Sequence, residues 1–174
     1  MDEAGILTAR DMVEMAIQTE QNGSAFYTGA AAQAGSPEMA KLLRWLASQE
    51  QEHASVFRTM LTSPERHQPA EQYGGQRSGF VQALLEARVL PDKETGAQRL
   101  AAMTGDEEIL DFALGFEKDT ILFMYEMRDV SSPASRETLD RLIREEKTHV
   151  ARLLALKHAL RHPGDSGPEA TAEE

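Results

Sequence analysis

The sequence predicts an all-α fold, a four-helix bundle in which a long crossover containing short helices joins the second long helix to the third. Ala, Leu, Met, Glu, Gln and Arg dominate the 174 residues and favour helix, whereas β-branched runs are scarce. In four long segments, apolar residues recur at spacings of three and four, the period of a helix with one apolar face. Gly, Pro and Ser cluster between these segments and mark the breaks.

The first helix is expected from Thr8 to about Ala34, because Thr8 with Asp11 three residues later resembles a capping box with Asp in place of the usual Glu. Glu20 stands at the centre of its apolar stripe, where a core helix would normally carry an apolar side chain. The next turn of the stripe is small, which would leave room beside this carboxylate. The stripe consists of Val13, Ile17, Glu20, Gly23, Ser24 and Tyr27.

The second helix is expected from Pro37 to about Leu61. Gly35 ends the first helix, and Ser36 before Pro37 is typical of an N-cap followed by the first helical residue. The two helices should therefore form an antiparallel hairpin. Trp45 lies off the apolar stripe and is expected to cover a neighbouring subunit or the crossover. Two polar residues interrupt the stripe, which consists of Met39, Leu43, Leu46, Glu50, His53, Phe57 and Met60.

The crossover is expected to follow this second helix. Thr62–Ser78 is rich in Pro, Gly and Gln and predicts a loop, while Gly79–Val89 and Lys93–Met103 each predict a short helix. A connection of this length can carry the chain from one end of a bundle to the other.

The third helix is expected to open at a capping box, Thr104-Gly105-Asp106-Glu107, and to run to about Asp129. Like the first helix, it carries a lone carboxylate, Glu117, on its apolar face. Its stripe consists of Leu110, Ala113, Leu114, Glu117, Ile121, Met124 and Tyr125.

The fourth helix is expected from Pro133 to about Arg161, after an N-cap at Ser132. Its stripe consists of Leu139, Leu142, Ile143, Glu146, His149, Val150 and Leu153. Residues 1–164 are therefore expected to form one bundle domain, and the small, polar and acidic residues 165–174 a disordered tail.

Two Glu-x-x-His motifs dominate the pattern: Glu50 with His53 in the second helix, and Glu146 with His149 in the fourth. Residues three apart share a helix face, so each motif can direct a carboxylate and an imidazole toward the same point. In both helices a Ser-Pro pair begins fourteen residues before the glutamate, and the two motifs are 96 residues apart. Both motifs should therefore lie at the same depth in their helices.

The lone glutamates Glu20 and Glu117 each stand one helix before a motif and are 97 residues apart. Two hairpins related by a pseudo-twofold axis would bring all six side chains to one centre, and four glutamates with two histidines suit a pair of iron or manganese ions. A single Glu-x-x-His is usually a surface feature of an acidic helix, but two copies at matched depth favour the metal site. The predicted metal-binding and catalytic residues are Glu20, Glu50, His53, Glu117, Glu146 and His149.

The remaining tyrosines and histidines of interest allow more than one interpretation. Tyr27 and Tyr125 follow the lone glutamates by seven and eight residues. They could bond ligand carboxylates, relay electrons or serve only as buried structural residues. His67, His158 and His162 have no glutamate at the right spacing and are expected in solvent.

Composition excludes several classes of function. The chain has no cysteine, which rules out a disulfide, a thiolate metal site or an iron–sulfur cluster within it. The formal net charge of −11 disfavours nucleic acid as a partner. No apolar run approaches twenty residues, so no membrane span or membrane partner is expected. The absence of cysteine favours a cytoplasmic location.

On these residues, the chain resembles the ferritin-like di-iron proteins, and the rubrerythrin group in particular, over about residues 8–161. The resemblance extends to Phe26-Tyr27 after the first predicted ligand. It implies a non-haem centre of two iron ions, with manganese or a mixed pair possible, that reacts with hydrogen peroxide or dioxygen. Leu114 stands where rubrerythrins often carry a further glutamate, and the rubredoxin domain is missing. Gln51 replaces the haem-ligand methionine of bacterioferritin, and that family's short fifth helix is absent too.

The resemblance implies an enzyme of the peroxidase or ferroxidase type that oxidises ferrous iron with peroxide or dioxygen. One alternative is an iron-handling protein that oxidises and passes on iron without a second substrate. Others are a di-iron oxygenase, which would need a pocket beside the metals, and a structural bundle without metal. An unidentified electron donor and a homodimer are the expected partners.

Overall fold

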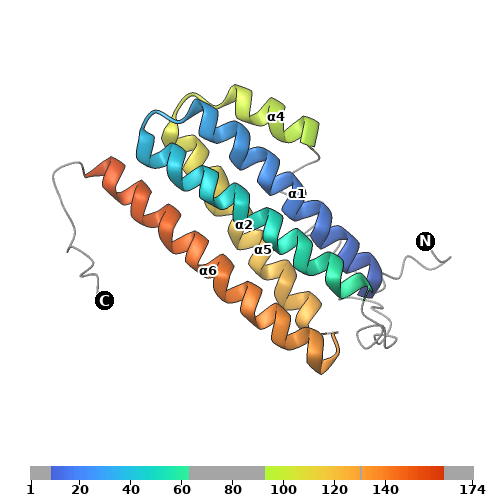
Figure 1. The fold of residues 1–174 in the computed structure, drawn as a ribbon. Coiled ribbons are helices and arrows are strands. Elements are labelled where there is room, and N and C mark those ends of the chain that lie inside the picture. The colour runs from blue at the N-terminus through green and yellow to red at the C-terminus, as the bar shows by residue number, and fades with distance from the viewer. Residues whose placement is uncertain (1–8, 63–92, 130, 163–174) are drawn as a thin grey trace.

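The computed structural model describes residues 9–62, 93–129 and 131–162 and confirms the predicted all-α bundle. Four long helices form the bundle, and a fifth, shorter helix lies against its outside (Figure 1). Within the described residues the helices are α1 (Ala9–Gln33), α2 (Pro37–Thr62), α4 (Lys93–Ala102), α5 (Asp106–Asp129) and α6 (Pro133–Arg161).

The bundle consists of two antiparallel hairpins, α1 with α2 and α5 with α6, as Figure 1 shows. Helices α2 and α5 run in the same direction, so the end of α2 and the start of α5 lie at opposite ends of the bundle. Helix α4, the predicted short helix, ends this connection and packs on α1, where Leu100 is buried. The predicted loop up to Ser78 and the predicted helix Gly79–Val89 lie outside the described residues.

Serine N-caps begin α2 and α6, as predicted. The Ser36 hydroxyl accepts the backbone N–H of Met39 at 3.1 Å. The Ser132 hydroxyl accepts the N–H of Ser135 at 3.3 Å, from an extended backbone with φ −62° and ψ 157°. Each hydroxyl satisfies one of the N–H groups that a helix start leaves without a partner.

The predicted capping box of the third helix is wrong by one residue. Helix α5 begins at Asp106, and Glu108, not Glu107, accepts the backbone N–H of Thr104 at 2.8 Å. Glu107 instead pairs with Arg161 at the end of α6. The predicted start of the first helix at Thr8 lies outside the described residues.

The core divides into two apolar layers with a polar layer between them. One layer lies toward the α1–α2 turn and contains Phe26, Leu46 and Leu110; the other lies toward the opposite end and contains Met12 and Phe57. On each of the four long helices, a buried glutamate falls between residues of the two layers. The fold thus places the polar layer at mid-height, enclosed above and below by apolar side chains.

Most residues of the predicted inward stripes are buried, with exceptions on α1 and α5 and at Val150 on α6, which is only partly buried. Met12 is buried at the start of α1, whereas Val13 and Ile17 are only partly buried. Ile121 is also only partly buried, and Tyr125 is 38% exposed. The 3.6-residue period explains these errors, because an inward stripe drifts around the helix over several turns.

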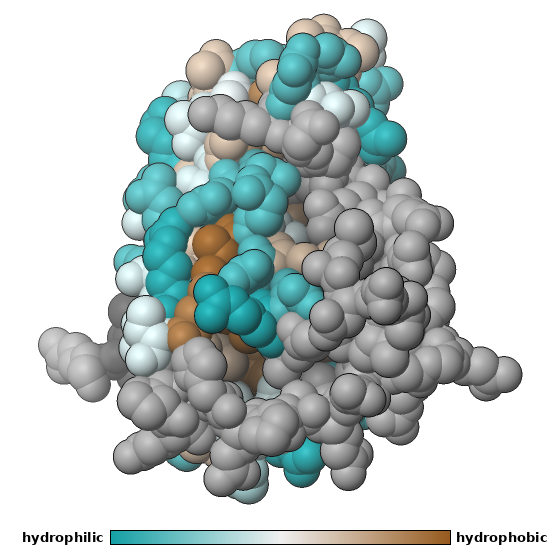
Figure 2. Space-filling view, turned by 90° about the vertical axis from the view of Figure 1, so that its right-hand side faces the viewer, coloured by the Kyte–Doolittle hydropathy of each residue, from teal (hydrophilic) through white to brown (hydrophobic). Residues whose placement is uncertain are grey.

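The surface of the described residues is largely hydrophilic on the face shown in Figure 2, where a hydrophobic strip is visible between hydrophilic residues. None of the helices in the described ranges has an apolar stretch long enough to span a membrane.

Candidate metal centre

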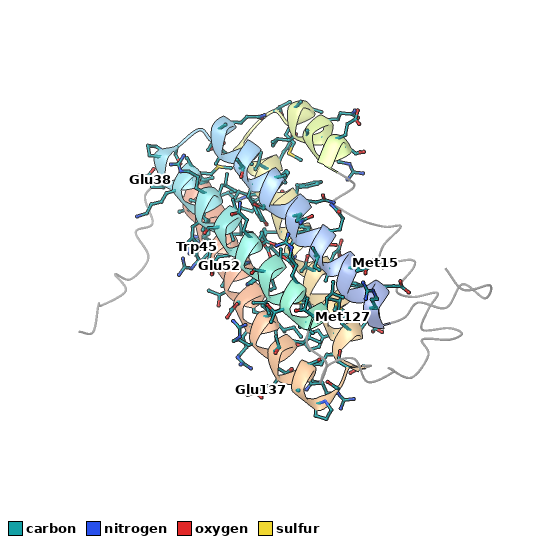
Figure 3. All side chains as sticks on the ribbon, turned by 45° about the vertical axis from the view of Figure 1, so that its right-hand side comes forward. Met15, Glu38, Trp45, Glu52, Met127 and Glu137 are labelled. Atoms are coloured by element: carbon teal, nitrogen blue, oxygen red, sulfur yellow. The ribbon has the colours of Figure 1, made fainter. Side chains whose placement is uncertain are left out.

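All six predicted site residues meet in the polar layer. Glu20 on α1 and Glu117 on α5 come from the two helices without a Glu-x-x-His motif, and α2 and α6 each supply a glutamate and a histidine. None of the six is more than 2% exposed. Figure 3 shows the side chains that fill the space between these helices. All six side chains therefore turn into the core of the bundle.

The six side chains form two groups that share two members. The first group is Glu20, Glu50, His53 and Glu146, and the second is Glu50, Glu117, Glu146 and His149. Within each group, one ligand atom per residue lies within 4.8 Å of the others. The glutamates of the two motifs, Glu50 and Glu146, are therefore common to both groups, whereas Glu20 and Glu117 each belong to one. Each of these last two is therefore the terminal carboxylate of its own group; the sequence had left open whether they would complete or bridge the metal sites.

Both histidines direct Nδ1 toward the carboxylates. In His53 this atom lies 2.8 Å from Glu146 Oε1 and 3.8 Å from Glu20 Oε2. In His149 it lies 2.8 Å from Glu146 Oε2, 3.4 Å from Glu117 Oε2 and 3.6 Å from Glu50 Oε1. The two imidazole rings stack with centroids 5.4 Å apart and an interplanar angle of 16°. Glu146 thus lies between the two histidines.

Despite these short distances, most of the polar atoms form no hydrogen bond of acceptable geometry. Within the part of the chain that the structure describes, several of these buried atoms have no hydrogen-bond partner: both oxygens of Glu20, Glu50 and Glu146, one oxygen of Glu117 and Nδ1 of both histidines. Buried polar atoms are normally satisfied, and leaving so many without a partner would be costly. Two cations accepting these lone pairs would satisfy them, and the charges of four carboxylates would balance two divalent ions. The residues present therefore fit a di-iron centre.

The rubrerythrin family model matches residues 11–157, which include all six site residues. The chain belongs to the rubrerythrin family. Its structure is similar to that of a protein from Thermotoga maritima described as a ferritin-like diiron-carboxylate protein, with a TM-score of 0.69 and 26% sequence identity. The match covers 88% of this chain and 96% of the other. Among curated proteins, no sequence matches significantly.

In this rubrerythrin-family centre, the carboxylates would hold protons in the absence of cations. Burial is the main cause that raises the pKa of Glu117 to about 8, with repulsion from Glu146 adding to it. Burial and neighbouring carboxylates also raise the pKa values of Glu20 and Glu50 well above their usual range. Glu146 differs, because its contacts with both histidines outweigh burial and lower its pKa.

The pKa values of both histidines are raised, whereas burial would lower the pKa of an isolated imidazole. Burial alone would lower the pKa of His53, but Glu146 and the other nearby carboxylates raise it to about 9. Glu117 and Glu146 likewise outweigh burial and raise the pKa of His149 to about 10. Protons and metal ions therefore compete for the same group of atoms.

Tyr27 bonds one of the ligand carboxylates, which was one of the three roles that the sequence allowed. Its buried hydroxyl donates to Glu117 Oε1 at 2.5 Å. Burial and the nearby Glu117 raise the pKa of this phenol, so it stays a proton donor. Tyr125, in contrast, lies at the surface, where its hydroxyl accepts from Lys147 at 2.9 Å. His158 and His162 are exposed as predicted, and His67 lies outside the described residues.

Two neighbours of the centre were missed by sequence reasoning. Trp45 packs its ring edge-on against His149, with centroids 5.2 Å apart, and Arg152 lies 4.0 Å above the Trp45 ring. Trp45 therefore lies on the seam between α2 and α6, beside the site. Glu145 lies 3.0 Å from His53 on the other side of the imidazole. The position of Glu145 directly before Glu146 is the feature of the sequence that could have identified it as a neighbour of the centre.

Gly23 provides the space that was predicted from its small size. A Cβ at this position would lie 2.8 Å from the ring of Phe116 and 3.2 Å from Glu50 Oε2. We expect Gly23→Ala to lower the free energy of unfolding by about 1–3 kcal/mol, because neither the ring nor the carboxylate has room to move away. Urea denaturation would measure this. Gly105→Ala is the control, because its added Cβ would meet no atom within 4 Å. A loss below about 0.5 kcal/mol, the size of an ordinary surface effect, would show that the core adjusts freely.

Proposed function

We propose that this rubrerythrin-family protein is a non-haem di-iron redox enzyme that oxidises ferrous iron with hydrogen peroxide or dioxygen. The observation that carries the proposal is the pair of four-residue groups that share Glu50 and Glu146. Two adjacent sites joined by shared carboxylates allow two electrons to be delivered at one place. When bound, the iron pair would supply this redox chemistry toward peroxide or dioxygen.

The ligand assignment follows the two groups. Glu20 and His53 would hold one ion, Glu117 and His149 the other, and both ions would share the two remaining glutamates. All ligand atoms are oxygens or imidazole nitrogens, which suit iron and manganese. Manganese or a mixed pair therefore stays a possible loading.

The other residues around the centre control orientation and access. Tyr27 holds Glu117 through one oxygen and leaves Oε2 directed at His149 Nδ1, 3.4 Å away. The apolar layers above and below exclude bulk water, which strengthens electrostatic interactions inside the site. Leu114, buried one turn before Glu117, brings no further carboxylate to the centre.

Stopped-flow oxidation of the ferrous-loaded protein, with peroxide and with dioxygen side by side, tests the proposal. We expect wild-type protein to react readily once with either oxidant but to turn over slowly without a dedicated electron donor. Leu114→Glu should raise the rate with peroxide relative to dioxygen, since it adds a carboxylate on the face of Glu117. Leu114→Gln is the matched neutral control. No oxidation by either oxidant would contradict the redox function.

An iron-handling protein is the second candidate, and Leu114 favours it, because no spare carboxylate supports repeated peroxide turnover. In that case oxidised iron should leave the protein for a ferric chelator at a rate comparable to its oxidation. Wild-type protein that strongly prefers peroxide and cycles fast with a generic reductant would exclude this candidate. A homodimer and an unidentified electron donor stay predictions.

A further inference from the structure

The centre has two halves, Glu20 with His53 and Glu117 with His149. They differ in what contacts the histidine Nε2, the ring nitrogen that faces away from the centre. Nε2 of His53 lies 3.0 Å from Glu145 Oε2, and Arg141 donates to the other oxygen of that carboxylate at 3.0 Å. A carboxylate can only accept here, so Nε2 carries the hydrogen and donates it. In the neutral imidazole, which is the form that binds a metal ion, Nδ1 then directs its lone pair into the centre, toward Glu20 and Glu146.

Among the described residues, His149 has no such support. Its Nδ1 also faces the centre, but its Nε2 is buried without a hydrogen-bond partner. The residue that corresponds to Glu145 in the other half, 96 positions earlier, is Gln49, whose amide donates to Glu52 at 3.2 Å. The residue that corresponds to Arg141 is Trp45, which packs against the ring of His149. An ion pair behind one histidine is thus replaced by an aromatic ring behind the other.

The terminal carboxylates Glu20 and Glu117 also differ, in the number of oxygens that already accept a hydrogen bond. Both oxygens of Glu20 are free of hydrogen bonds, whereas Oε1 of Glu117 accepts from Tyr27. The residue that corresponds to Tyr27, 97 positions later, is Met124, which offers no hydrogen to Glu20. The Glu20–His53 half can therefore offer two free oxygens and a histidine in a defined tautomer, against one free oxygen and an unsupported histidine in the other half.

We propose that Glu145 is a positioning residue that makes the Glu20–His53 half the tighter metal site, so that it is filled first. This inference rests on the proposed di-metal function. A carboxylate behind a metal-binding histidine sets its tautomer and ring orientation and increases its basicity, and removal of such a partner typically costs about 10–100-fold in metal affinity. Arg141 holds Glu145 in place, since their contact spans one helical turn on α6.

Anaerobic titration of the full-length, metal-stripped protein with Co²⁺ tests the order of filling. Calorimetry reports both binding steps. Fluorescence of Trp45, the single tryptophan of the chain, reports the His149 half, because the two rings are in contact. Quenching by a bound Co²⁺ ion falls steeply with distance. Because both sites lie near Trp45, the two ions should differ in the extent of quenching: we expect a tighter first ion that quenches the fluorescence less and a weaker second ion, beside His149, that quenches it more.

Variants then locate the tight site. His53→Ala should remove the first step and keep the quenching step. Glu145→Ala should weaken the first binding step by about 10–100-fold and bring most of the quenching forward to the first equivalent. The first-step affinity of Glu145→Gln should lie between those of wild type and Glu145→Ala, because its amide oxygen still accepts a hydrogen bond. Glu52→Gln is the matched control: it removes a surface carboxylate one residue from His53 that bonds only Gln49 among the described contacts. Its first step should equal that of wild type.

The possible failures are distinguishable. Two ions of equal affinity in wild type, or a Glu145→Gln protein that binds like Glu52→Gln, would overturn the positioning role while leaving the di-metal function intact. Stronger quenching by the first equivalent than by the second in wild type would likewise overturn it. If wild-type protein bound no Co²⁺ and no ferrous iron, the proposed function itself would fall.

Discussion

Glu146→Ala should abolish binding of both metal ions, the largest effect expected from any single substitution at the centre. Glu146 belongs to both ligand groups, and each of its oxygens lies 2.8 Å from Nδ1 of one histidine. Loss of this side chain removes a negative charge and a ligand from both sites at once. Metal content measured after anaerobic reconstitution with ferrous iron should fall from about two ions per chain to near zero.

Two comparisons make this result specific. Glu20→Ala removes a terminal ligand of one site only, so we expect it to lose about one ion of the two. Glu137→Ala, an exposed position on the same helix as Glu146, should keep both ions. A Glu146→Ala protein that retained two ions would contradict the shared position of this carboxylate.

The second large effect should be a pH-dependent loss of stability when metal is removed. In the folded metal-free protein, the pKa values of Glu20 and Glu50 are raised well above 4.5, and that of Glu117 is raised to about 8. The pKa values of His53 and His149 are raised from 6.5 to about 9 and about 10. In each case the folded state binds protons more tightly than the unfolded chain.

The sign follows from linkage: such groups stabilise the fold at low pH, and the stabilisation is lost as pH rises through the folded pKa values. The lowered pKa of Glu146 acts in the opposite direction, but its contribution is complete above about pH 5, since its unfolded value is 4.5. The melting temperature of metal-free protein should therefore fall between about pH 5 and pH 9. Bound ions replace the protons, so loaded protein should show a much smaller decline.

The difference in melting temperature between metal-loaded and metal-free protein should be large near neutral pH. Each ion that binds only the folded state adds about 4 kcal/mol at a free concentration one thousand times its dissociation constant. For a domain of this size, each kcal/mol corresponds to roughly 2–4 °C in Tm. We therefore expect loaded protein to melt roughly 10 °C or more above metal-free protein, measured by circular dichroism.

A neutral variant checks the cause. Glu20→Gln cannot ionise, so the metal-free variant should melt above metal-free wild type at pH 8 and show a weaker pH dependence. The exposed Glu137→Gln should behave like wild type. If loaded and metal-free wild type melted alike from pH 5 to 9, the polar layer would not be a tight metal site.

The limits of the four long helices, and most of the side chains that turn inward on them, could be predicted from the amino-acid sequence alone. Ser36 and Ser132 set the starts of α2 and α6, because a serine before proline can cap a helix from within its own few residues. Glu20 and Glu117 were recognisable because each interrupts an apolar stripe of a single helix. These are local properties, which a helical period of 3.6 residues makes readable.

Only the tertiary structure decided which side chains meet across helices. Glu50 and Glu146 are the shared pair, Glu145 reaches from α6 to His53 on α2, and Trp45 rests on His149. The placement of Tyr125 at the surface was decided in the same way. The physical reason is that a periodic pattern fixes the face of one helix, whereas contacts between helices depend on their relative rotation and axial shift. Those are set by the packing of the two apolar layers as a whole.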